Sequence, residues 1–189
     1  SLIALAAYLL MAHTVPAETH YVWTNSPTPA SPFTNWDTAA HDIQAALDVA
    51  TNGSTVLVTD GTYRVSTQLS ITQQITLRGA NVYPMPIIHA ESNRCLYVGA
   101  PATIQGLKFT NGYVNTAPKF GAGVYAVSTG VTVQNCGFFR NSAGTSGQGG
   151  GLWLGTSGHM ESCTFLQNSA GDGGALYAAG VVYLDSGYF

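Results

Sequence analysis

The sequence predicts an all-β fold, a right-handed parallel β-helix (a solenoid) with a short N-terminal capping helix. Three observations lead to it. A motif recurs every 24 to 29 residues in the second half of the chain, short apolar segments alternate with turn residues, and one segment near the N-terminus has helical periodicity. Periods of about 20 to 50 residues indicate stacked structural units. The repeats contain no helical stretch and no leucine-dense signature, which favours a β-helix over leucine-rich repeats.

The repeat begins with an apolar residue, has a small or apolar residue three positions later, and Phe two positions after that. Its copies start at Ile104, Val133, Met160 and Leu184. The first three copies continue with an Asn and then a small-residue triplet before an aliphatic–aromatic pair, as in 149–153. Only the gap between Asn and the aliphatic residue varies strongly in length. One loop therefore absorbs the insertions, as is typical of a solenoid.

Coils stacked about 4.8 Å apart would place equivalent residues in columns. We expect three structural columns: an aromatic stack of Phe109, Phe138 and Phe165, which Phe189 would extend; a hydrogen-bonded ladder of Asn111, Asn141 and Asn168; and an internal column containing Cys136 and Cys163. Parallel side chains fit disulfide geometry poorly, so the two cysteines are interpreted as small buried hydrophobes. The cysteine spacing fits no zinc motif.

The only segment with helical spacing is 37–50, where apolar residues recur at Ala39, Ile43, Ala46, Leu47 and Ala50. Asp37 or Thr38 could cap its start, and Asn52-Gly53 would end it. We expect this helix to cover the open N-terminal end of the stack, because an exposed sheet edge invites aggregation. Residues 18–36 are rich in Pro, Thr, Ser and Asn and predict an irregular leader.

Residues 1–17 are predicted to be a clipped Sec-type signal peptide. The apolar run 2–12 is shorter than the roughly 20 residues that cross a bilayer, and small residues follow it. A buried N-terminal helix is the alternative. No other segment could span a membrane, so we expect a secreted or cell-surface location, either extracellular or at an outer membrane. The β-helix domain, 37–189, stops within a copy of the repeat, and we expect it to be truncated.

The charge of the chain excludes one class of partner. Only 8% of the residues are charged, against about 25% in an average protein, and the formal net charge is −3. Nucleic-acid binding requires a basic face, which this composition does not provide. We therefore expect no nucleic-acid partner.

The repeats resemble those of a known group. Phe-x-x-Asn at 138–141 and 165–168, followed by Gly-Gly-Ala-Leu at 173–176, is similar to the repeats of chlamydial-type polymorphic outer membrane proteins. The stretch from 43 to 63 resembles the N-terminal cap and first coil of pectate-lyase-like β-helix proteins. The resemblance implies an exported bacterial β-helix. It implies little about activity, since this architecture hosts adhesins, lyases and glycosidases alike.

One outward column carries the candidate catalytic residues. It would contain Gln105, Gln134, Glu161 and Asp185. Glu161 and Asp185, one coil apart, could bring carboxylates within about 5 Å, the separation found in retaining glycosidases. Such a pair could also attract calcium, although we expect no cofactor and no metal. The competing interpretation is an inert, solvated polar column.

A second outward column is aromatic and consists of Tyr125, Trp153 and Tyr177. Exposed rings at regular steps could bind a glycan or a protein on a host or neighbouring cell. The competing interpretation is that the rings only cover the loop of variable length. We expect a non-enzymatic, adhesin-type structural or binding module. The alternative is a polysaccharide lyase or glycoside hydrolase of the pectate-lyase-like fold.

Overall fold

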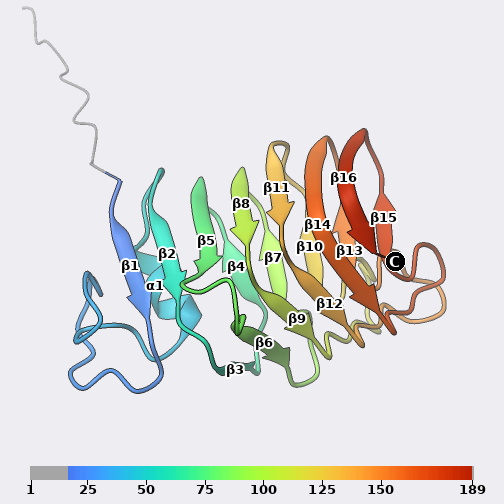
Figure 1. The fold of residues 1–189 in the computed structure, drawn as a ribbon. Coiled ribbons are helices and arrows are strands. Elements are labelled where there is room, and N and C mark those ends of the chain that lie inside the picture. The colour runs from blue at the N-terminus through green and yellow to red at the C-terminus, as the bar shows by residue number, and fades with distance from the viewer. Residues whose placement is uncertain (1–16, 189) are drawn as a thin grey trace, which may run out of the picture.

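A computed structural model describes residues 17–188, and in it the chain winds into a parallel β-solenoid of about five turns (Figure 1). This confirms the predicted all-β solenoid. Residues 1–16 of the predicted signal peptide and Phe189 lie outside the described residues. Among the residues described, no helix is both long and apolar enough to cross a bilayer.

The solenoid has three faces, and each coil from β2 to β15 contributes one strand, or one half of β14, to each face. The first face contains β1 (Thr19–Val22), β2 (Thr55–Val58), β5 (Ile75–Gly79), β8 (Ala102–Gln105), β11 (Val131–Gln134), the start of β14 (Gly158–Leu166) and β16 (Val182–Tyr188). The second contains β3 (Thr62–Val65), β6 (Ile87–Ala90), β9 (Lys108–Thr110), β12 (Gly137–Phe139) and the end of β14. The third contains β4 (Leu69–Ile71), β7 (Leu96–Val98), β10 (Val124–Ala126), β13 (Leu152–Leu154) and β15 (Leu176–Ala178).

All strand pairs are parallel and join equivalent residues of neighbouring coils. Strand β14 passes through the corner between the first two faces, pairing with β11 through its first half and with β12 through its second. These two faces therefore form one continuous 11-stranded sheet, whereas the third face is a separate five-stranded sheet. Within each strand apolar residues alternate inward, so the core is a single column of side chains along the axis.

Residues with positive φ make the tight corners. Gly106, Asn135 and Ser162 have φ values of 64°, 51° and 51° at equivalent positions between the first and second faces. At the entry to the third face, the first residue of each predicted small-residue triplet has positive φ, at Gly121, Gly149 and Gly173. A glycine is favoured at these positions because a side chain is strained in the left-handed region.

The capping helix is shorter than predicted. Helix α1 spans Ile43–Val49, and its N-cap is Asp42, whose carboxylate accepts a hydrogen bond of 2.8 Å from the Ala45 amide. The periodic residue Ala39 and both predicted caps belong to the turns before it, so the predicted start at residue 37 is wrong. The apolar spacing alone did not show where the backbone becomes helical.

Helix α1 covers the N-terminal end of the stack and contacts β1, β2 and β4. The Gln44 side chain accepts a 2.8 Å hydrogen bond from the Ser70 amide, so an amide on the edge of β4 is satisfied. The segment predicted as an irregular leader contains β1, which pairs with β2 and extends the first face. Its hydrogen bonds come from the backbone, which composition does not reveal.

Candidate functional site

The predicted aromatic residues form one ladder on the outer side of the third face. Tyr125 is the register partner of Trp153, which is the partner of Tyr177. Tyr97 on β7 extends the ladder by one coil. All four side chains are partly exposed. The strand alternation therefore brings together the three predicted ligand-binding residues and adds a fourth.

The faces of the central ring are occupied. The Trp153 indole stacks on Phe120 at 5.3 Å between centroids and 17°, and on Tyr177 at 6.4 Å and 6°. Phe120 comes from the coil before Trp153 and Tyr177 from the coil after it. Tyr125 meets Trp153 edge-on at 4.9 Å and 67°. The ladder thus presents mainly ring edges and polar tips outward, because its ring faces pack on one another.

Phe120 belongs to the loop of variable length, so the loop-covering interpretation of the rings also holds in part. Arg94 fixes this loop. Its Nε donates to the carbonyls of Phe120 and Gly121 at 3.0 and 2.9 Å, and its Nη1 donates to Gln68 Oε1 at 2.6 Å. The guanidinium carbon lies 4.8 Å from the Tyr125 ring centroid. Burial lowers the pKa of Arg94 and raises that of Tyr125.

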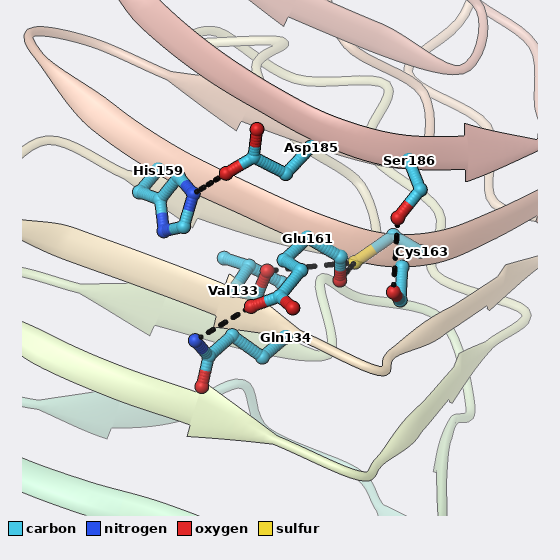
Figure 2. Close-up of polar contacts among 8 residues, drawn as sticks. Val133, Gln134, His159, Glu161, Cys163, Asp185 and Ser186 are labelled. Atoms are coloured by element: carbon cyan, nitrogen blue, oxygen red, sulfur yellow. Dashed lines mark hydrogen bonds and ion pairs between the residues drawn. The ribbon is translucent and has the colours of Figure 1, made fainter.

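The two candidate catalytic carboxylates lie on neighbouring coils, where Glu161 and Asp185 are register partners. They turn to different partners, as Figure 2 shows. Glu161 Oε2 accepts a 3.0 Å hydrogen bond from Gln134 Nε2, and Asp185 Oδ2 lies 2.8 Å from His159 Nε2. The Asp185 side chain is 70% exposed. The arrangement is a polar surface column in which each carboxylate has its own local partner.

The interior columns are positioned by the same register. Phe138 stacks on Phe109 at 5.4 Å and 20°, and on Phe165 at 4.7 Å and 6°. All three rings are buried. Such pairs add roughly 0.5–1.5 kcal/mol each beyond the burial of their area. The aromatic stack therefore links three successive coils through one continuous contact.

The asparagine ladder contains Asn141 and Asn168 but not Asn111. Asn111 has a φ of 60° and an exposed side chain, and Gly112 takes the equivalent ladder position, donating its amide to Asn141 Oδ1 at 2.8 Å. The prediction that Asn111 joins the ladder is wrong by one residue. The first copy is one residue shorter between Phe109 and its Asn, so Asn111 lies on the corner itself.

Cys136 and Cys163 are free buried thiols at the corner between the first two faces. Cys136 Sγ donates to the Ile104 carbonyl and Cys163 Sγ to the Val133 carbonyl, each at 3.6 Å in the preceding coil. Burial raises the pKa of both thiols, that of Cys163 to about 11. Within residues 17–188, no three His, Cys, Asp or Glu side chains gather where they could hold a metal ion.

The sequence interpretation missed Tyr97, Phe120 and Arg94. Tyr97 lies between two buried apolar residues in 96–98, and this alternation could have revealed it. The coil that contains Tyr97 has no glycine-rich triplet before its aliphatic–aromatic pair, so the repeat motif did not identify it as a copy. Phe120 and Arg94 lie in loops whose packing depends on tertiary contacts, and no local pattern marks them.

A model of the Chlamydia polymorphic membrane protein repeat matches residues 162–179. This segment contains the corner at Ser162, Phe165 of the aromatic stack, Asn168 of the ladder, and β15. No curated protein and no solved structure matches the chain significantly. Together with the β-solenoid, the repeat indicates a surface-exposed bacterial protein.

Proposed function

We propose that this chain is a non-enzymatic, adhesin-type module that binds a protein on a host or neighbouring cell through its aromatic ladder. The observation that carries the proposal is the regular line of Tyr97, Tyr125, Trp153 and Tyr177 on one face of a solenoid. Tyr, Trp and Arg are the residues that most often dominate binding energy at protein interfaces. Arg94 lies beside the same rings.

A protein partner fits the ladder better than a sugar does. Stacking on a sugar requires a free ring face, and rings from the coils before and after it pack on the Trp153 indole. Ring edges, phenol hydroxyls and a guanidinium form a mixed surface of the kind found at protein interfaces. The solenoid holds these groups in place before binding, which reduces the entropy cost of ordering them.

The proposal is tested with beads coated with the purified chain and applied to cultured cells. Tyr177→Ser should reduce bead attachment at least tenfold, whereas Tyr183→Ser, the same change at a tyrosine of β16 that is 68% exposed, should leave it unchanged. Brief protease treatment of the cells should abolish attachment. Equal loss with both variants, or attachment that survives proteolysis, would contradict the proposal.

The enzyme alternative is tested separately. The purified chain is incubated with pectin, alginate and xylan, and unsaturated or reducing ends are measured. We expect no release above the buffer control. Release that disappears with Glu161→Gln would overturn the non-enzymatic assignment, because that carboxylate would then be the acid or base of a cleavage reaction.

A further inference from the structure

The outer side of the second face carries a groove of about 480 Å³ that is separate from the aromatic ladder. Its floor follows one register column with one residue per coil. The column runs through Arg64, His89, Thr110, Phe139 and Leu166 on β3, β6, β9, β12 and β14. Neighbouring positions are therefore separated by about 4.8 Å along the solenoid axis.

The groove is the basic surface of an acidic chain. Arg64, His89 and Arg140 line it, and Lys108 projects from the neighbouring outward column of the same face. Three of the six Lys and Arg residues of the chain thus gather on this face, although the net charge is −3. Strands β3, β6, β9 and β12 and the end of β14 that pairs with β12 (164–166) contain no Asp or Glu. The nearby acid is Glu91, which lies 3.7 Å from Arg64.

An aromatic ring lies beside these charges. A Cβ atom on Gly137 would come within 2.4 Å of Phe139 Cε2 and within 3.4 Å of Lys108 Cγ. The Phe139 ring therefore folds back over Gly137 and lies next to the lysine stem, low against the sheet. A partly exposed ring in this position offers a platform on which a sugar ring could stack.

We propose that this groove binds a linear anionic glycan, a polysaccharide whose sugars carry carboxylate or sulfate groups. Guanidinium groups bind both anions through paired hydrogen bonds. Arg140 Nε already donates to Gln167 Oε1 at 3.0 Å, which orients that guanidinium on the groove rim.

The spacing favours a glycan over the other extended polymers. The coil step of about 4.8 Å is close to the length of one sugar unit, whereas an extended peptide advances only about 3.3 Å per residue and falls out of step with the column. Nucleic-acid binding relies on many contacts between basic side chains and phosphates, and the net negative charge of this chain disfavours it. The proposal concerns a different face from the aromatic ladder, so either proposal can fail alone.

The Glu91 carboxylate would compete with an anionic ligand for Arg64. Both members of the Arg64–Glu91 pair are well exposed, at 65% and 45% of their side-chain areas. Exposed pairs of this kind contribute little to stability. An anionic sugar can therefore take the place of Glu91 on Arg64, and removal of this carboxylate should strengthen binding.

The experiment measures binding of the full chain to a sulfated heparin fragment, a polygalacturonate fragment and neutral dextran, at low and high salt. We expect affinity for at least one anionic glycan, none for dextran, and weakening with salt. Arg64→Gln with Arg140→Gln should reduce affinity at least tenfold, and Glu91→Gln should raise it severalfold. The matched control, Arg78→Gln with Lys119→Gln, removes the same charge elsewhere and should change affinity less than twofold.

Binding to heparin alone assigns sulfate as the recognised group, and binding to polygalacturonate alone assigns carboxylate. Circular dichroism of each variant establishes that the fold is retained. The proposal is overturned if neither anionic fragment binds, if dextran binds equally well, or if the control pair loses as much affinity as the groove pair.

Discussion

The side-chain oxygen of Asn168 accepts two hydrogen bonds from Asn141 in the preceding coil, one from its backbone amide at 3.0 Å and one from its side-chain amide at 2.9 Å. One coil earlier, the side-chain oxygen of Asn141 accepts a hydrogen bond from the Gly112 amide in the same way. The side-chain amide of Asn141 also donates a hydrogen bond to the Phe109 carbonyl. The ladder thus satisfies backbone groups that the turn between the second and third faces frees from strand pairing.

Asn141→Ala should lower the free energy of unfolding by about 3 kcal/mol. Asn141 is fully buried, and the change leaves the Gly112 amide without its partner, at roughly 1–3 kcal/mol, and also removes a hydrogen bond on the Phe109 carbonyl and the contacts of the side chain itself. Urea unfolding followed by circular dichroism measures the loss. Asn111→Gly is the control, because Asn111 is exposed and its positive φ suits glycine. A similar loss in both variants would show that the ladder is not the cause.

Phe138→Ala should cost about 3–5 kcal/mol of stability, because it removes the ring between Phe109 and Phe165 and leaves a cavity. Phe138→Leu should cost less, about 1–1.5 kcal/mol, since it retains most of the volume. The adjacent, outward-facing Phe139→Leu provides the comparison. If thermal unfolding ranks Phe139→Leu as more harmful than Phe138→Leu, the assignment of inside and outside is reversed.

The repeat spacing was sufficient to predict the solenoid and the aromatic stack, since an inward residue recurring once per coil must meet its equivalent in the next coil. The aromatic ladder followed from alternation around Leu152 and Leu176. Both predictions rest on strand geometry, in which side chains alternate at every residue. Local periodicity therefore carried the information for the regular faces.

The corners could not be predicted in the same way. Asn111 matched the motif by residue type but lies one position early, because the backbone enters the left-handed region there. Phe120 and Arg94 reach the ladder through loop contacts between residues of different coils. Helix α1 begins at Ile43, after the Asp42 cap, although Asp37 and Thr38 are equally suitable residue types for a cap. Backbone conformation at the corner, contacts between coils and the choice of capping side chain decide these cases, and residue type alone reveals none of them.

The buried thiols should make the protein less stable at alkaline pH. Burial raises the pKa of Cys95 to about 12 and of Cys163 to about 11, and raises that of Cys136 also. Above the unfolded value of about 8.5, the unfolded chain releases thiol protons that the folded chain retains, so stability is lost as pH rises. The slope approaches about 1.4 kcal/mol per pH unit for each thiol. Urea unfolding between pH 7.5 and 10 measures it.

Cys163→Ala should make this pH profile shallower by the contribution of one thiol. The native thiols should also resist alkylation at pH 8 and react once the chain is unfolded in denaturant. Rapid alkylation of the native protein, or a stability profile that stays flat up to pH 10, would contradict the burial of these groups.

Arg94→Lys should loosen the loop over the aromatic ladder. A lysine keeps the charge but cannot reach Gln68 and the Phe120 and Gly121 carbonyls together with one planar group. We expect a loss of about 2 kcal/mol and faster proteolytic cleavage within 111–123. Mass spectrometry of limited digests locates the cut. Unchanged cleavage kinetics would mean that Phe120 alone holds the loop.

The stacking of successive coils is tested most directly by nuclear Overhauser effects between phenylalanine rings in a selectively labelled sample. With single Phe→Leu variants used for assignment, the Phe138 ring should show contacts to both Phe109 and Phe165, at centroid distances of 5.4 and 4.7 Å. Phe109 and Phe165 are separated by two coil steps of about 4.8 Å each, so their rings should show no contact with each other. A folded protein in which Phe138 contacts neither ring would contradict the solenoid.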